Sequence, residues 1–312
     1  AYRNLSLAYY NKQQDATKSL SCLTTAFNLN PEDGRVLMEL DQLCKLQNSS
    51  HWNRLQLLEE HPDLVSYRDD LYLERITLYN LLGDFETAAA LLSERTFHPW
   101  EGGEGKTVSQ YLICYTELAK EHIISGDFER SLEFLDTASA YPDNLGEGQL
   151  PGTIHNDLHY LQGFSYEGLF RKAESQQAYW AATKGDSKPV QAFFYNDPQP
   201  DQIFYQGMAW IKLGDPQKGK QLFQSLIDFG ALHYADPIRI DYFAVSLPDL
   251  LVFDKDLNMK NRNHCDYMIG LGHLGLGNYE KAEAHFQQLL KEDNSHQGAI
   301  THLNMITFLS KQ

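Results

Sequence analysis

Five short turns of one kind recur along this chain and constrain its fold more than any other feature. Each follows an apolar helical stretch and begins with glycine, and most continue with an aromatic residue two positions later. They are Gly83-Asp84-Phe85, Gly126-Asp127-Phe128, Gly168-Leu169-Phe170, Gly214-Asp215-Pro216 and Gly277-Asn278-Tyr279. Glycine readily adopts the left-handed conformation that ends a helix, so each turn predicts a pair of helices. We expect the aromatic residue to pack back into its pair.

The positions around each turn also repeat. A small residue stands three positions after the aromatic position, and a large apolar residue usually follows four positions further, which predicts one apolar face on the second helix. The small residues are Ala88, Ser131, Ala173, Gly219 and Ala282, and the large ones are Leu92, Leu135, Phe223 and Phe286. In the first helix, Ala119, Gly207 and Gly270 are predicted positions of close helix approach.

This spacing resembles the tetratricopeptide repeat, in which a glycine turn lies between two helices that carry small and aromatic positions and a proline follows. Residues 267–294 match best, with Asn294 in place of the proline. The first copy keeps Pro31, although its turn at residues 13–15 lacks glycine. Residues 34–62 form a degenerate pair in which Ser50 is the expected N-cap of the second helix.

The predicted fold is therefore all-α: a tetratricopeptide-like α-α superhelix of about six to seven helix pairs, with long inter-repeat insertions and a C-terminal capping helix. A doubly layered helical barrel would also have paired helices, but it would not require the same glycine turn each time. We expect a single repeat domain over residues 1–312. Its units are predicted at 1–33, 34–66, 67–108, 109–156, 157–200, 201–262 and 263–297, with the cap at 298–312.

Every interval between turn glycines exceeds the family unit of about 34 residues. The extra sequence falls after the second helix of each pair, so we expect all insertions to emerge along one edge of the superhelix. The longest insertion, residues 240–254, has two apolar runs around Pro248 that must be covered. Either neighbouring helices of this chain or a second domain could cover them.

Charge and composition exclude several classes of function. Acidic residues outnumber basic ones by 42 to 26, giving a formal charge of -16, which disfavours nucleic acids and anionic membranes as partners. No apolar run approaches the ~20 residues needed to cross a bilayer. The four cysteines are far apart and form no CxxC, so we expect free thiols and a cytoplasmic protein. No motif predicts a metal or another cofactor.

The insertions carry residues that a sugar site would need, namely aromatic platforms and carboxylates. The acids Glu101, Glu104 and Asp241 are the candidate catalytic residues. The candidate binding residues are Trp100, Glu147, Tyr195, Asp197, Asp201, Tyr242 and Phe243. Each acid could instead belong to a turn, a helix cap or a solvated surface, and Asp201 is also an expected N-cap. By their helical spacing, Trp180 and Trp210 are expected in the core.

Four insertion motifs carry a second resemblance: FHPWEGGEGK, YPDNLGEGQLPG, YNDPQPDQIFYQG and IDYFAVSLPDLLVFD. They resemble the C-terminal repeat region of large, mostly bacterial proteins whose N-terminal domain of unknown function is similar to mutarotase and glycoside-hydrolase β-sandwiches. The resemblance implies that this chain is a fragment of a longer, carbohydrate-associated protein. It assigns no catalytic residue.

Two functional hypotheses follow. In the first, the chain is a protein–protein or interdomain scaffold, whose groove and loop-decorated edge bind another protein or the N-terminal domain of the same chain. In the second, it is the helical half of a carbohydrate-active or glycan-binding protein, and the loop residues complete a sugar site. We do not expect this fragment alone to be an enzyme.

Overall fold

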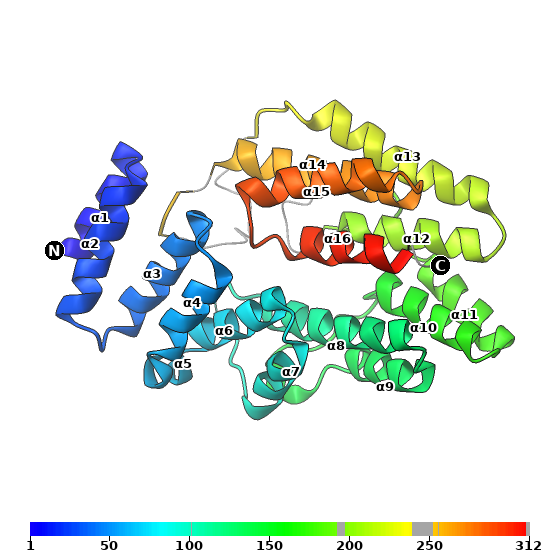
Figure 1. Ribbon diagram of the computed structural model, residues 1–312, viewed down its shortest axis with the longest axis horizontal. Coiled ribbons are helices and arrows are strands. Elements are labelled where there is room, and N and C mark those ends of the chain that lie inside the picture. The colour runs from blue at the N-terminus through cyan, green and yellow to red at the C-terminus, as the bar shows by residue number, and fades with distance from the viewer. Residues whose placement is uncertain (101, 192–196, 239–251, 255, 310–312) are drawn as a thin grey trace.

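The computed structural model describes residues 1–100, 102–191, 197–238, 252–254 and 256–309, which form helices and loops without a strand. The α-helices, shown in Figure 1, are α1 (Tyr2–Gln13), α2 (Ala16–Leu29), α3 (Gly34–Leu46), α4 (His51–Glu59), α5 (Pro62–Tyr67), α6 (Asp69–Leu82), α7 (Phe85–Glu94), α8 (Lys106–Ser125), α9 (Phe128–Ser139), α10 (Asn156–Gly168), α11 (Lys172–Ala182), α12 (Pro200–Lys212), α13 (Pro216–His233), α14 (Leu257–Gly275), α15 (Tyr279–Glu292) and α16 (Gln297–Leu309). A short 3-10 helix, η1 (Asp143–Leu145), lies between α9 and α10.

Successive helices pack as pairs: α1 with α2, α8 with α9, α10 with α11, α12 with α13 and α14 with α15. Alternate helices also meet, as in the contacts of α10 with α12 and of α12 with α14, so each pair stacks on the next. The predicted all-α superhelix is confirmed. None of the described helices is long and apolar enough to span a membrane.

The predicted glycine turn is confirmed at four of its five positions. Gly83, Gly126, Gly214 and Gly277 have φ values of 82°, 82°, 89° and 74°, in the left-handed region. In three of these turns the next residue is an aspartate whose carboxylate accepts a hydrogen bond from the backbone three residues on. Glycine ends one helix and aspartate starts the next, so each turn determines both helix ends locally.

The fifth turn differs from the prediction. Gly168 stays inside α10 because the Phe128 ring packs where its side chain would be, and Phe170 takes the left-handed conformation with φ 60°. Phe170 is 95% exposed, so it does not pack back into its pair. Helix α11 consequently starts later, which leaves Ala173 exposed and places Ser175 at the buried small position.

Close contact between small and large residues holds the pairs together. A Cβ added to Gly207 would lie 2.4 Å from the Phe223 ring, and one added to Gly270 would lie 2.5 Å from the Phe286 ring. Both phenylalanines are fully buried. The predicted positions of close approach in α12 and α14 are therefore confirmed, and they admit no larger side chain without displacement of the ring.

Ser50 is the N-cap residue of α4, as predicted, although its side chain makes no capping hydrogen bond. Two other local predictions are wrong. Asp201 lies in the first turn of α12, because Pro200 already starts the helix and Gln199 is the N-cap. Trp180 and Trp210 are not in the core: Trp180 is 49% exposed, and its ring packs edge-on against that of the half-buried Trp210.

The first two insertions fold against each other. The Phe97 amide donates to the Asn144 carbonyl at 2.7 Å, and the Asn144 side-chain amide donates to the carbonyls of Leu92 and Arg95 at 2.8 Å. The end of the longest insertion packs on α1: Phe253 is buried against Tyr10, and Asn11 bonds to the backbone of Val252 and Asp254. Residues 252–254 are therefore covered by a helix of the same chain, which is the first of the two predicted alternatives.

The superhelix closes on itself. The turn between the last pair and α16, drawn from orange to red in Figure 1, reaches the α3–α4 turn near the start of the chain. Asn294 and Asn48 bond to each other there although 246 positions separate them. Together with the contact of residues 252–254 on α1, this junction joins the two ends of the stack.

Candidate functional site

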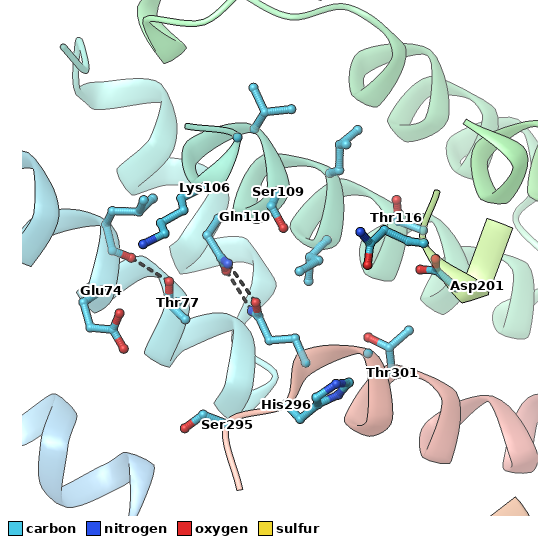
Figure 2. Close-up of a pocket in the computed structure, with 18 of the residues that line it drawn as sticks. Glu74, Thr77, Lys106, Ser109, Gln110, Thr116, Asp201, Ser295, His296 and Thr301 are labelled. Carbon is cyan, nitrogen blue, oxygen red and sulfur yellow. Dashed lines mark hydrogen bonds between the residues drawn. The ribbon is translucent and has the colours of Figure 1, made fainter. Parts of the chain in front are cut away.

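A cavity of about 1060 Å³ lies inside the closed superhelix, and it is the main candidate for a binding site. Its lining comes from α3, α6, α8, α10, α12, α14 and α16, together with residues just before these helices. These are the first helices of their pairs and the capping helix. Figure 2 shows side chains of α6, α8, α12 and α16 converging from opposite sides of this space.

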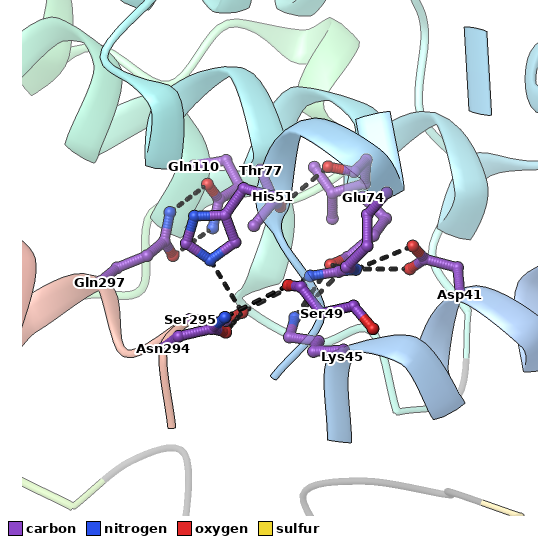
Figure 3. A network of polar contacts seen from close by, with 12 residues as sticks. Asp41, Lys45, Ser49, His51, Glu74, Thr77, Gln110, Asn294, Ser295 and Gln297 are labelled. Carbon is purple, nitrogen blue, oxygen red and sulfur yellow. Dashed lines mark hydrogen bonds and ion pairs between the residues drawn. The ribbon is translucent and has the colours of Figure 1, made fainter. Parts of the chain in front are cut away.

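One end of the cavity is formed by the junction of the two chain ends, shown in Figure 3. The Asn48 side chain donates to the carbonyls of Lys291 and Glu292 at 3.1 and 3.0 Å and accepts from the Asn294 amide at 3.0 Å. The Asn294 side chain donates to the carbonyls of Asn48 and Ser49. Asn48 has φ 52°, a left-handed conformation that asparagine tolerates better than most residues. We call Asn48, Ser49 and Asn294 the end clasp.

A second contact of the same kind lies beside the end clasp. The side-chain amides of Gln110 in α8 and Gln297 in α16 each donate to the oxygen of the other at 2.8 Å. Asn80 donates to the Gln110 carbonyl and side chain from α6. Most of the hydrogen bonds at the junction join uncharged groups of distant repeats, and salt screens such bonds little.

A buried charge network adjoins the clasp. Arg54 in α4 donates to both oxygens of Asp41 at 3.0 and 2.8 Å and to Glu74 at 2.5 Å. Lys45 also bonds to Glu74, at 3.0 Å. Burial acts to raise the pKa of Glu74, yet Lys45 and Arg54 overcome it and lower that pKa to about 2. Glu74 is thus ionised at neutral pH, and the network ties α3, α4 and α6 together.

The opposite end of the cavity holds a second polar cluster. Lys120 donates to Glu117 at 2.7 Å within α8. Asp157 of α10 and Asp201 of α12 lie near each other, and burial together with repulsion from Asp157 raises the pKa of Asp201 to about 6. Asp201 keeps some accessible surface, and it is one of the residues that line the cavity. Figure 2 shows Asp201 on the same side of the space as Thr116.

His302 of α16 completes this cluster. Its Nδ1 lies 2.8 Å from the Gly298 carbonyl and 3.1 Å from the Tyr267 hydroxyl. A carbonyl only accepts, so Nδ1 carries the proton and Nε2 is an acceptor. Nε2 has no hydrogen-bond partner, and neither has Thr116 Oγ1, although the two side chains are only 2% and 6% exposed. Burial lowers the pKa of His302 to about 3, so the ring is neutral at pH 7.

The cavity offers little for metal binding or thiol chemistry. Among the described residues, no three His, Cys, Asp or Glu side chains are placed to hold a metal ion. The four cysteines are free, as predicted. Burial raises the pKa of Cys114 to about 12 and that of Cys265 to about 11, which keeps both thiols protonated and unreactive. The arrangement is suited to binding through hydrogen bonds and charge.

Three of the candidate residues from the insertions line this cavity: Trp100, Glu104 and Asp201. Glu147 lies next to them, because its carboxylate accepts from the Gly105 amide at 3.0 Å, and burial raises its pKa. Asp197 is half-buried and raises the pKa of His264, another lining residue, against the larger effect of burial. The remaining candidates lie outside the described residues: Glu101, Tyr195, Asp241, Tyr242 and Phe243.

The aromatic rings of the cavity are poor sugar platforms. The Trp100 indole packs directly on Gly103, where an added Cβ would lie 2.2 Å from the ring, so its own loop occupies one face. Tyr205 and Tyr267 are buried. Stacking of a sugar needs an open ring face, and these three rings offer little of it.

Most of the polar lining was not singled out from the sequence. Asp41, Lys120, Asp157 and His302 stand in helices whose pattern predicts packing. The available signal was a charged or polar residue on the inner face of the first helix of a pair. That signal becomes specific only when several repeats are placed around a common space.

A match to a family model supports the repeat resemblance. Residues 203–228 and 265–295 match the tetratricopeptide repeat model. A tetratricopeptide repeat protein from Parabacteroides merdae is similar over 98% of this chain and 97% of its own, at 11% identity and a TM-score of 0.45. A structure of Naa15/Naa10 bound to HypK-THB is similar over 97% of this chain and 50% of its own, at 13% identity and a TM-score of 0.41. A structure of the APC/C hetero-tetramer Cut9-Hcn1 is similar over 99% of this chain and 49% of its own, at 14% identity and a TM-score of 0.31.

These matches have a limited reach. The family model supports tetratricopeptide repeats in the part of the chain that contains α12 to α15. The matches give no support to a mutarotase-like N-terminal domain, to a bacterial origin or to an association with carbohydrate.

Proposed function

We propose that this chain is a protein-interaction module, expected in the cytoplasm, that holds a polypeptide segment inside its central cavity. The partner is another protein or another domain. The observation that carries the proposal is the cavity itself: seven helices from residue 38 to residue 302 turn their inner faces towards one space of about 1060 Å³. Tetratricopeptide repeats are helix pairs whose stacking creates extended concave binding surfaces.

The size and lining of the cavity favour a peptide over a small ligand. Pockets for small molecules measure about 300–1000 Å³ and are mostly apolar. This cavity is at or above that limit, and its lining mixes carboxylates, amines, amides and hydroxyls, including Ser109, Gln110 and Thr301. A peptide carries a backbone donor and acceptor at almost every residue, which such a lining can satisfy along its length.

A peptide-display experiment tests this proposal. A library of random twelve-residue peptides is selected on the intact chain, and the affinities of enriched peptides are measured by fluorescence anisotropy. Ser109 lines the cavity from an exposed position on α8, so Ser109→Trp fills the space without disturbing a core contact. Ser125→Trp is the matched control, because Ser125 is exposed on the same helix and does not line the cavity.

We expect micromolar binding by the wild type, at least tenfold weaker binding by Ser109→Trp and unchanged binding by Ser125→Trp. Failure to enrich any peptide would refute the proposal. So would equal binding by the two tryptophan variants, since the peptides would then bind elsewhere on the molecule.

A further inference from the structure

The polar cluster at the Asp201 end of the cavity carries an excess of negative charge. Glu117, Asp157 and Asp201 supply three carboxylates, and Lys120 supplies one ammonium group, which bonds to Glu117. The four histidines of the cavity do not offset this excess. Burial lowers the pKa of each of them, so they are neutral at pH 7: His155, His264, His296 and His302.

Two buried polar atoms of the cavity that can accept hydrogen bonds have no partner. His302 Nε2 is an acceptor because Nδ1 donates to Gly298, and no group donates to it. Thr116 Oγ1 also lacks a partner. Buried polar groups normally have a partner, and leaving one unpaired costs about 1–3 kcal/mol. A ligand that brings several N–H donors would satisfy these atoms.

The same groups surround His302 and Asp201. Burial lowers the pKa of His302, and the Lys120 charge lowers it further. Burial and the Asp157 charge raise the pKa of Asp201, and the Lys120 charge opposes this rise. Lys120, His302, Asp157 and Asp201 all line the cavity. They come from α8, α10, α12 and α16, so the four helices form one pocket, which we call the Asp157–Asp201 pocket.

A metal ion does not fit this arrangement, since no described group of three ligating side chains is placed for one. An organic cation does fit, because ammonium and guanidinium groups carry only donors and pair well with carboxylates. We propose that the Asp157–Asp201 pocket receives the side chain of a lysine or arginine from the polypeptide held in the cavity. This inference rests on the proposed function and adds the chemistry of its partner.

The titration of Asp201 supports the inference. Burial and the Asp157 charge raise its pKa to about 6, while Lys120 and the Gln202 amide oppose the rise. A bound cation would favour the ionised form and return this pKa towards its ordinary value. Binding of a basic peptide near pH 6 should therefore release a proton, and its affinity should fall as the pH drops from 7 to 5.

The test uses capped nine-residue peptides of alanine and serine that differ only at the central position, which is lysine, arginine, norleucine or glutamate. We expect the lysine and arginine peptides to bind the wild type at least tenfold more tightly than the norleucine peptide, and the glutamate peptide to bind most weakly. The variants Asp157→Asn and Asp201→Asn should remove the preference for lysine and arginine over norleucine. Glu104→Gln is the matched control, because it removes an exposed carboxylate elsewhere in the cavity and should keep the preference.

The outcomes separate the two proposals. If the four peptides bind equally and the asparagine variants change nothing, the pocket is not a cation site, and the proposed function stands. If no peptide binds, or if Ser109→Trp leaves binding unchanged, both proposals fail. Thermal melts by circular dichroism verify that each variant is folded, and a Lys120→Met variant, which deepens the negative charge, should strengthen the preference for basic peptides.

Discussion

Replacement of Arg54 by methionine should destabilise the protein strongly because it leaves a buried carboxylate without its cation. The Arg54 and Asp41 side chains are only 1% and 3% exposed, and they share two hydrogen bonds of 3.0 and 2.8 Å. Removing one partner of a buried ion pair costs about 3–5 kcal/mol. With an unfolding entropy near 2.1 cal/mol/K per residue, this corresponds to a fall in Tm of about 5–8 °C if the chain unfolds as one unit.

The loss should depend on pH in a definite direction. Burial raises the pKa of Asp41, and the Arg54 guanidinium opposes that rise, so the pKa must increase further in Arg54→Met. A carboxyl whose folded pKa is raised above its unfolded value destabilises the fold as it ionises. The deficit of the variant should therefore be largest at neutral pH and shrink as the pH falls towards 4, where Asp41 takes up a proton.

Urea unfolding followed by circular dichroism at pH 7.5 and 4.5 measures both effects. The double variant Arg54→Met with Asp41→Leu should recover most of the lost stability, because the unpaired charge is gone. Arg171→Met is the control, since Arg171 pairs with Glu174 on the surface and its loss should cost less than about 1 kcal/mol. A deficit that does not change with pH, or that persists in the double variant, would refute this reasoning.

Three further predictions concern packing, closure and titration. Gly207→Ala should lower stability by about 1–3 kcal/mol because its Cβ would lie 2.4 Å from the Phe223 ring, while Gly148→Ala, with open space around it, should be neutral in the same urea titration. Asn294→Ala removes two hydrogen bonds of the end clasp and should cost about 1–3 kcal/mol, with faster hydrogen exchange at the α3–α4 turn. Asp201 has a raised pKa of about 6, so its ionisation opposes folding. The free energy of unfolding of Asp201→Asn should therefore increase relative to that of the wild type as the pH rises from 4 to 7. A difference that stays constant with pH would contradict this.

Local sequence determined the helix pairs of this protein. A left-handed glycine followed by aspartate ends one helix and starts the next through bonds within a few residues, so Gly83, Gly126 and Gly214 could be interpreted without knowledge of the rest of the chain. The pairing of a small residue with a large one is nearly as local, as Gly270 and Phe286 show. The prediction failed where a ring from another pair intervened: Phe128 packs on Gly168 and moves the turn to Phe170.

Tertiary structure alone decided the closure and the cavity. Asn48 and Asn294 are 246 positions apart, and nothing in either residue predicts the other, because their bond depends on the summed rotation of all the stacked pairs between them. The same holds for Lys120, Asp157, Asp201 and His302, each of which occurs in an ordinary helical pattern. The sequence by itself specified the repeating unit, whose interactions are short-range. Which polar residues share one pocket was settled only when the stack curved far enough to bring its first and last repeats together.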